Sequence, residues 1–468
     1  MTIWLPELGD RPGPRYRAIA DALAADISSG ALAPGARLPT HRDLAWRLGV
    51  TVGTVSRAYA EAERRGLLAG EVGRGTFVRT ASRPADRSFA FHEAAVADVI
   101  DFAYNIPLTG SEAPALAATL TRLAASPDFA ALVGYGPPAG RPADRAAGAA
   151  WIARSLLPAV PERVVLTHGG QHGVALLLSV LTRPGDTIAV ECLTYPGLKA
   201  LANLLDLRLV GLAMDEEGLL PEAFDRACRG GEVKALYTMP SLHNPLAIVM
   251  PQARRRAIAI VAERHGVPVI EDDVLSFLLP EPVPPIGAFA PEQGFYVAST
   301  SKSLMPGLRV GYVHAPAAWV ERLAAAMRAT SYMAPPLMAA VATAWIADGT
   351  ADRLVLAKRA MAAARSHLVG AILGGLPMRR HPAGTHLLLT PPPAWHGEEL
   401  IAAARRRGVA LAPLSAFAVG RSVPESLAPA NAVRLCYGTP AHEADLERGL
   451  RILAELLRLE PAADLSLV

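Results

Sequence analysis

Residues 299–312 read STSKSLMPGLRVGY, which sets a lysine in a turn of small residues seven positions before an arginine. The chain has 42 arginines and only four lysines, so a need for positive charge does not explain the choice of Lys302. A lysine amine can lose its proton and form a Schiff base with an aldehyde, whereas a guanidinium stays charged. Most loop lysines are simply solvated cations. The surrounding sequence therefore decides whether this lysine carries chemistry.

The sequence on both sides of this stretch alternates short apolar runs with longer helical stretches rich in alanine and leucine. Such runs are typical of buried parallel strands, and strands that alternate with helices form an α/β sheet covered on both faces. Sites in these sheets lie at the carboxyl ends of the strands. We therefore expect an α/β fold with functional side chains directly after the strands. The runs are RVVLTHG, TIAVEC, ALYTMP, VPVIEDD, GFYVAST and RVGYVHA.

Four further motifs place polar residues at strand ends. In LTHGGQHGVALLLSVL two glycines precede a long helix, so the amides of Gly170 and Gln171 suit a phosphate, although such a feature is usually only a turn. In VIEDDVLSF two carboxylates follow an apolar strand; one of them suits a protonated heteroaromatic nitrogen, and a solvated loop acid is the usual alternative. Asn244 in MPSLHNPLAI has an ordinary turn as its alternative. Arg434 in NAVRLCYG lies in an apolar strand, where an arginine is unusual without a partner anion.

Together and in this order, the motifs resemble those of the fold-type I pyridoxal 5′-phosphate enzymes, the aminotransferase superfamily. SKSLMPGLRVGY is a close match to the lysine segment of that superfamily. The resemblance implies a large domain with a mixed or parallel sheet, a smaller C-terminal α/β domain, and pyridoxal 5′-phosphate as cofactor. It implies that Lys302 is the catalytic, Schiff-base lysine and that Arg309 binds the phosphate. The other cofactor-binding residues that it implies are Gly170, Gln171, Tyr195, Asn244, Asp272, Ser299 and Ser301.

The resemblance also implies what the side chains around the cofactor ring do. Asp272 would keep the pyridine nitrogen protonated, which makes the ring an electron sink. Asn244 would form a hydrogen bond with the ring hydroxyl oxygen, and Tyr195 would stack on the ring face. Arg434 would bind a substrate carboxylate through two hydrogen bonds.

Two motifs depart from the superfamily pattern. A tyrosine commonly stands two or three positions after the pyridine aspartate, and Val274 and Leu275 fill those positions here. A hydrogen bond to the ionised ring oxygen favours one protonation state, so its loss changes the pKa of the Schiff base. The asparagine motif has Leu246 and Ala247 where Thr-Gly is usual. Cofactor binding is therefore predicted more directly than efficient transamination.

The N-terminal segment carries the positive surplus of the chain. Residues 1–80 hold 11 arginines and 8 acidic residues, a surplus equal to the net charge of +3 of the whole chain. Helical spacing of apolar residues between Tyr16 and Ile27 predicts one helix. We expect Thr40 to cap a second helix that ends at Gly49, and Thr51 to cap a third. GLLAGEVGRGTFV then suits a β-hairpin. This layout predicts a helix-turn-helix, with a purely structural three-helix module as the alternative.

LPTHRDLAWRLGVTVGTVSRAYAEAERRGLLAGEVGRGTFV resembles the winged helix-turn-helix of the GntR-type regulators over nearly its whole length. That family usually has a polar or basic pair directly after the valine, and Val52 and Gly53 stand there in this chain. The resemblance implies double-stranded DNA as a partner. The residues that it places on phosphates or base edges are Arg42, Thr54 and Arg57, with Arg74 and Gly75 at the minor groove or the backbone.

A winged helix-turn-helix followed by an aminotransferase-like chain resembles the MocR-type regulators, over almost all of residues 12–460. We expect a DNA-binding domain at 12–78, a linker at 79–98, a cofactor-binding large domain at 99–315 and a small C-terminal domain at 316–468. The leading hypothesis is a transcriptional regulator that senses pyridoxal phosphate or an amino compound as an aldimine on Lys302. The alternatives are a working aminotransferase that acts on an amino acid, and a DNA-binding protein whose large domain only dimerises.

Composition narrows the class of protein. With 51% hydrophobic and 19% charged residues the 468-residue chain can bury several cores, and no apolar run reaches the ~20 residues of a membrane span. The N-terminus lacks the layout of a signal peptide, so we expect a soluble, cytoplasmic protein without a membrane partner. Cys192, Cys228 and Cys436 are widely spaced and indicate neither a disulfide framework nor a metal site. The family resemblance implies a head-to-tail homodimer.

Overall fold

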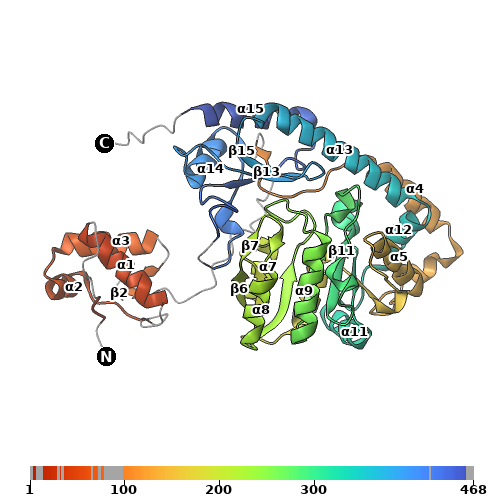
Figure 1. Ribbon diagram of the computed structural model, residues 1–468, viewed down its shortest axis with the longest axis horizontal. Coiled ribbons are helices and arrows are strands. Elements are labelled where there is room, and N and C mark those ends of the chain that lie inside the picture. The colour runs from red at the N-terminus through yellow and green to blue at the C-terminus, as the bar shows by residue number, and fades with distance from the viewer. Residues whose placement is uncertain are drawn as a thin grey trace. The chain divides into compact units, whose positions relative to one another are not determined.

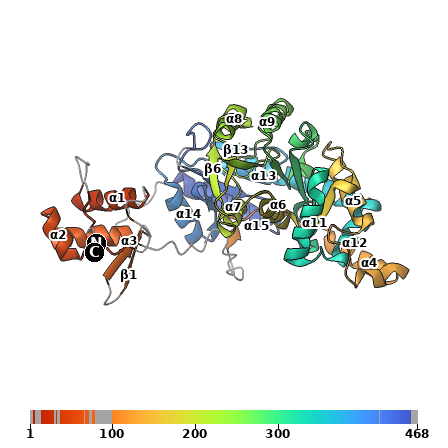
Figure 2. The ribbon, with the colours of Figure 1, turned by 90° about the horizontal axis from the view of Figure 1, so that it is seen from below.

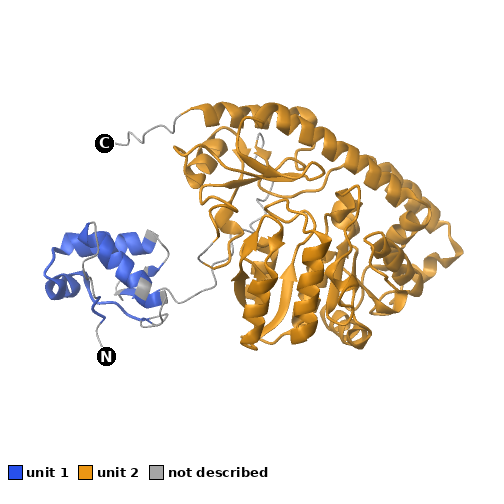
Figure 3. Cartoon of the chain, viewed as in Figure 1, with its two compact units in different colours: residues 1–87 blue, residues 88–468 orange. Residues whose placement is uncertain are grey.

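The computed structural model describes residues 4–6, 14–28, 32, 36–64, 67–71, 75–78, 99–420 and 423–459. The chain divides into two compact units, residues 1–87 and 88–468 (Figure 3). The linker predicted at 79–98 lies outside the described residues, and the predicted domain boundaries stay predictions. In the part of the chain that is described, no helix combines the length and the apolar character that crossing a bilayer requires.

The first unit has the helices and the hairpin that its sequence predicts. Its elements are α1 (Arg15–Ser28), α2 (His41–Leu48), α3 (Val52–Arg64), β1 (Leu68–Glu71) and β2 (Gly75–Val78) (Figure 1). Thr40 Oγ1 accepts a hydrogen bond from the Asp43 amide at 3.2 Å, which caps α2, and Gly49 ends that helix with a left-handed φ of 63°. Thr51 Oγ1 accepts from the Thr54 amide at 3.2 Å at the start of α3. β1 and β2 pair antiparallel.

The core of the first unit is built from the apolar positions that recur at helical spacing. Its buried side chains include Ile19, Leu23, Leu44, Val55, Ala58, Tyr59 and Leu68. The Tyr59 hydroxyl donates to the carbonyl oxygen of Pro39 at 2.9 Å, which fixes α3 against the segment before α2. One face of α3 is thereby buried, and the opposite face is left to solvent.

A seven-stranded sheet forms the centre of the second unit, with strand order β4-β12-β11-β10-β9-β5-β6. Its strands are β4 (Val164–Thr167), β5 (Thr187–Glu191), β6 (Arg208–Leu212), β9 (Val233–Thr238), β10 (Val269–Asp273), β11 (Gly294–Ser299) and β12 (Gly311–His314). β12 runs antiparallel to both neighbours, whereas the other pairs are parallel. The chain between β11 and β12 is too short for a full crossover, which explains the reversed strand. The sheet is therefore mixed, and the predicted α/β fold is confirmed.

Helices cover both faces of this sheet, as the nearly continuous apolar strands predict. On one face lie α6 (Gly170–Leu181), α7 (Pro196–Leu204) and α11 (Ala317–Ser331). On the other face lie α5 (Pro142–Ala153), α8 (Pro221–Arg229), α9 (Gln252–His265) and α12 (Pro336–Ala347). Figure 2 shows α8 and α9 on one side of β6 and α7 on the other. Outside these layers are α4 (Glu112–Ala124) and the short α10 (Thr300–Ser303).

The C-terminal part of the second unit has a smaller sheet of order β13-β14-β17-β16. Its strands are β13 (Met378–Arg380), β14 (His386–Leu389), β16 (Ala412–Pro413) and β17 (Val433–Cys436). Helices α13 (Thr350–Leu373), α14 (Gly397–Arg406) and α15 (Glu443–Arg458) pack on it around a core of its own. Two-stranded pairs add β3 (Ile100–Asp101) with β15 (Val409–Ala410), and β7 (Met214–Asp215) with β8 (Gly218–Leu219). The first described strand of this unit, β3, therefore pairs with a strand of the C-terminal part.

Candidate functional site

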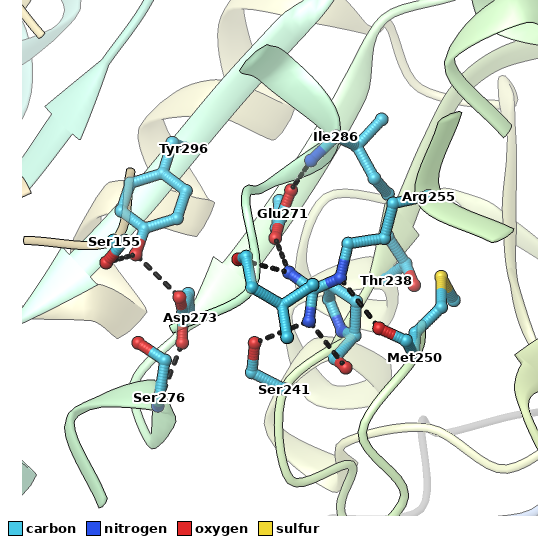
Figure 4. Close-up of polar contacts among 12 residues, drawn as sticks. Ser155, Thr238, Ser241, Met250, Arg255, Glu271, Asp273, Ser276, Ile286 and Tyr296 are labelled. Atoms are coloured by element: carbon cyan, nitrogen blue, oxygen red, sulfur yellow. Dashed lines mark hydrogen bonds and ion pairs between the residues drawn. The ribbon is translucent and has the colours of Figure 1, made fainter. Parts of the chain in front are cut away.

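The three consecutive acids at the end of β10 point to opposite faces of the sheet, because side chains alternate along a strand. Glu271 accepts from Arg255 Nη1 at 3.3 Å and from the Ile286 amide at 2.7 Å, on the face that α9 covers. Asp273 accepts from the Tyr296 hydroxyl at 2.6 Å on that same face (Figure 4). These two acids therefore support the sheet, and only the middle one points toward α6.

Asp272 is that middle acid, and it is 7% exposed. Its Oδ2 accepts a hydrogen bond from the buried Tyr237 hydroxyl at 2.6 Å, and its Oδ1 has no hydrogen-bond partner among the described residues. Burial raises the pKa of Asp272 to about 6, the Asp273 charge adds to this, and the Tyr237 bond opposes it. A carboxylate oxygen that is buried without a donor suits a ligand that brings an N–H group.

Lys302 lies in α10, directly after β11. Ser299 Oγ accepts from the Ser301 amide at 3.2 Å and so caps this one-turn helix. The amine of Lys302 donates to the carbonyl oxygen of Asn105. Burial lowers the pKa of Lys302 to about 8, and the cations of Arg434 and Arg309 act in the same direction. A neutral amine is a nucleophile, so Lys302 is the residue of this site that suits a carbonyl compound.

A turn of two glycines lies at the start of α6, against Arg309 and the end of β11. Gly169 has a positive φ of 83°, which favours glycine, and a Cβ there would lie 3.0 Å from Arg309 Nη2. A Cβ on Gly170 would lie 3.3 Å from Ser299 Cβ, which places the first amides of α6 against the end of β11. Arg309 Nη1 donates to Ser301 Oγ at 3.3 Å. Helix amides, hydroxyls and a guanidinium together suit a phosphate.

Arg434 and Asn244 form the side of the site that the C-terminal sheet contributes. Arg434 is buried on β17, donates from Nη1 to Asn244 Oδ1 at 3.2 Å and from Nη2 to the Ala103 carbonyl oxygen. Its Nε has no partner among the described residues, and its guanidinium lies 5.0 Å from the centre of the Phe417 ring. A buried guanidinium with an unpartnered N–H suits a carboxylate.

Tyr195 precedes α7 and lies among the same charges. Burial raises its pKa to about 12; the Asp272 charge adds to this, and the Arg434 and Arg309 charges oppose it. A Cβ on Gly197 would lie 2.3 Å from the Tyr195 ring, so glycine leaves room for the ring. The side chain of Gln171 donates to the Gly197 carbonyl oxygen at 3.1 Å, away from the phosphate-type contacts.

Comparison with known proteins places both units. Residues 15–78 match the family described as bacterial regulatory proteins of the gntR family, and residues 97–453 match aminotransferase class I and II. The HTH-type transcriptional regulator YdeF of Bacillus subtilis is 32% identical over 454 residues, which cover 97% of this chain and 96% of YdeF. The chain belongs to the MocR-type GntR regulators. It is a DNA-binding transcriptional regulator with an aminotransferase-like second unit.

Other relatives of this MocR-type regulator share the same organisation or the same fold. The pyridoxine biosynthesis transcriptional regulator PdxR of Corynebacterium glutamicum is 27% identical over 373 residues, which cover 78% of this chain and 80% of PdxR. The kynurenine aminotransferase of Pyrococcus horikoshii superposes with a TM-score of 0.70 at 22% identity, over 78% of this chain and 91% of that one. The structural likeness shows the fold.

The DNA-binding residues expected for this MocR-type regulator lie on α2, α3 and β2. Arg42 on α2 and Arg57 on α3 are exposed. Thr54 is only partly exposed, and its hydroxyl lies 2.9 Å from the Thr51 hydroxyl, within the cap of α3. Gly75 begins β2 and pairs with Glu71 in the hairpin. Arg74 lies outside the described residues.

Sequence reasoning missed three groups that contact the candidate site of this regulator. They are the Tyr237 hydroxyl on Asp272, the Asn105 carbonyl oxygen on Lys302, and the His168 carbonyl oxygen, which accepts from Arg309 Nη2 at 2.9 Å. Tyr237 lies in the apolar run ALYTMP, where a tyrosine is usually read as core. The two carbonyl groups belong to the backbone, so the residue types in the sequence do not indicate their contacts.

Proposed function

We propose that this regulator binds pyridoxal 5′-phosphate through Lys302 and changes its affinity for DNA when an amino compound reaches the site. The amine of Lys302 carries the proposal: it is buried, its pKa is lowered to about 8, and it lies among Arg309, Arg434 and Cys436. When bound, the cofactor supplies an aldehyde that condenses with amines and a ring that withdraws electrons. The relative PdxR is named as a regulator of pyridoxine biosynthesis, which supports a ligand of this class.

The residues present fit the cofactor. Asp272 Oδ1 is buried without a donor among the described residues, and a protonated ring nitrogen brings one. The turn at Gly169 and Gly170, with Arg309 beside it, suits the phosphate. Each end of the cofactor thus has a matched group: a carboxylate for the cationic nitrogen, a guanidinium and helix amides for the anion.

We assign the remaining roles to side chains that line the same space. Ser299 and Ser301 assist Arg309 with the phosphate, together with the amides of Gly170 and Gln171. Tyr195 covers the ring face, and Asn244 bonds the ring hydroxyl oxygen. Arg434 binds the carboxylate of the amino compound as a two-pronged ion pair, for which its buried Nε is free among the described residues.

The response requires an equilibrium between at least two arrangements of the regulator. An amino compound changes DNA affinity only by as much as it binds one arrangement better than another. A head-to-tail homodimer would place two helix-turn-helix modules on one operator, so both direct and inverted half-sites fit. The homodimer and a cytoplasmic location belong to this proposal, and sedimentation and cell fractionation test them.

Transamination of an amino acid is the second candidate, favoured by the joint presence of Lys302, Asp272 and Arg434 in one site. Val274 and Leu275 count against rapid turnover, because neither has a hydroxyl for the ring oxygen. Single-turnover conversion of the cofactor to its amine form with a panel of amino acids tests this candidate. No conversion with any of them would leave binding alone as the function of the site.

The first experiment is the absorbance spectrum of the full-length protein between roughly 300 and 500 nm, with and without borohydride, beside Lys302→Ala. We expect a visible band in the parent that borohydride abolishes and that the variant lacks. DNA affinity is then measured with and without pyridoxal phosphate and the amine panel. No band after addition of pyridoxal phosphate overturns the cofactor proposal. A band with unchanged DNA affinity overturns only the response to ligand.

A further inference from the structure

The start of α3 presents small and apolar groups to solvent, opposite the buried face that Val55 and Tyr59 occupy. Val52 is 44% exposed, and Gly53 beside it is exposed as well. In a helix-turn-helix the first residues of the second helix meet the base edges in the major groove. The first two residues of α3 in this regulator therefore carry an isopropyl group and no side chain at all.

The hydroxyl groups near these two residues already have partners inside the protein. The Thr51 and Thr54 hydroxyls lie 2.9 Å apart, and Thr51 Oγ1 also accepts from the Thr54 amide. Ser56 Oγ lies 3.0 Å from His41 Nδ1. Arg57, one turn after Gly53, is exposed and has no partner among the described residues. Val52 and Gly53 are thus the exposed residues of the first turn of α3, and the methyl groups of Val52 are the side-chain groups that they offer to bases.

Gly53 has no reason within the folded protein to be a glycine. A Cβ built there meets no atom closer than Thr51 Oγ1 at 3.8 Å, and the residue does not adopt the left-handed backbone conformation. Alanine is more favourable than glycine inside a helix. A glycine that the fold does not require, on a face that meets DNA, fits a close approach of the backbone to the base pairs.

We propose that Val52 reads the 5-methyl group of thymine in the major groove and that Gly53 lets the start of α3 reach it. The thymine methyl is the apolar group on the major-groove edges of the base pairs, and apolar side chains recognise it. The operator then carries a T·A pair opposite Val52 in each half-site. Arg57, on the same outer face as Gly53, lies one turn further along the groove.

The test uses the full-length protein and duplexes that it selects from a random pool. Each thymine of a selected duplex is replaced in turn by deoxyuridine, which removes only the methyl group, and affinity is measured by fluorescence anisotropy at one salt concentration. We expect about fourfold weaker binding at one thymine per half-site, the effect of one buried methyl group. Val52→Ala, which shortens the apolar side chain, should distinguish the thymine and uracil duplexes less than the parent does, and Val52→Thr, which keeps one methyl group, should still distinguish them.

Equal affinity of the parent for every uracil duplex overturns the proposal, as does an uracil effect of the same size in Val52→Ala. A selected pool without a fixed thymine in each half-site overturns it too.

Gly53→Ala tests the role of the glycine, because its stability and its DNA affinity should change in opposite directions. Its melting temperature should equal or exceed that of the parent, while its affinity for the selected duplex should fall at least tenfold. Unchanged affinity of Gly53→Ala rejects the close approach.

Discussion

The hydrogen bond from Tyr237 to Asp272 sets the charge of the candidate site, and Tyr237→Phe removes it without changing the shape of the ring. The bond is 2.6 Å long, both residues are buried, and Asp272 Oδ1 has no other donor among the described residues. A hydrogen bond to a charged group contributes about 1.5–3 kcal/mol. Burial already raises the pKa of Asp272 to about 6, and the Tyr237 bond opposes that rise. The variant should therefore raise the pKa of Asp272 further.

The size of this change follows from the energy of the bond. At 1.36 kcal/mol per pKa unit, its loss moves the titration of Asp272 upward by about one to two pH units. At pH 7 the variant then loses much of the carboxylate that the parent, above its pKa, retains. We expect its affinity for pyridoxal phosphate to fall roughly 2- to 10-fold at pH 7, in proportion to the ionised fraction of Asp272. The loss should shrink at pH 9, where the carboxyl group is ionised in both proteins.

Tyr296→Phe is the matched control. Tyr296 donates to Asp273 at the same distance of 2.6 Å (Figure 4) and is also buried. It lies on the opposite face of the same sheet, because Asp272 and Asp273 are successive residues of one strand. Both variants should lower the free energy of unfolding in urea, by about 1–3 kcal/mol each. Only Tyr237→Phe should weaken the binding of pyridoxal phosphate, followed by absorbance titration. An equal loss of affinity for pyridoxal phosphate in the two variants, or a loss of affinity in Tyr237→Phe that does not depend on pH, would refute the reasoning.

Three further predictions concern the second unit. The pKa of Lys302 is lowered to about 8, and only its neutral amine reacts with an aldehyde. The rate of pyridoxal phosphate uptake, measured by stopped-flow absorbance, should therefore rise as the pH passes through about 8. A rate that does not change with pH contradicts this prediction. Arg255→Met leaves buried Glu271 without its cation and should lower the free energy of urea unfolding by about 3–5 kcal/mol. Gly148→Ala places a Cβ 2.5 Å from Tyr312 Cδ1 and should cost about 1–3 kcal/mol in the same assay, whereas parent-like stability would show that the ring yields freely.

Local chemistry made much of the fold predictable from the sequence. Thr40 and Gly49 delimit α2 because a hydroxyl cap and a left-handed glycine act within a few residues of the chain. The strand runs were predictable because both faces of the sheet are buried, which demands continuous apolar sequence. The reversed direction of β12 was not predictable in this way, since an apolar strand reads the same in either direction.

The candidate site divides along the same line. Asp272 lies at the end of one strand run, and Lys302 follows directly after another. Both were predictable because sites in such sheets lie at the carboxyl ends of the strands. Tyr237 was missed because its contact with Asp272 depends on how β9 and β10 pair, with Tyr237 opposite Ile270. Register between strands is a tertiary property, and the apolar pattern of two buried strands leaves it open.

Rarity alone does not distinguish Lys302, because Lys358 is equally rare. Lys358 is fully buried, and Lys302 is partly buried. The difference lies in the charges around each amine. Lys358 forms an ion pair with Glu112 at 2.5 Å; burial lowers the pKa of Lys358, and the Glu112 carboxylate offsets part of that lowering. Around Lys302 the cations of Arg434 and Arg309 add to burial instead, and the pKa falls to about 8. The Glu112 carboxylate favours the charged form of Lys358, whereas the cations around Lys302 favour the neutral amine. Lys302 is therefore the lysine of this pair that is suited to react with an aldehyde.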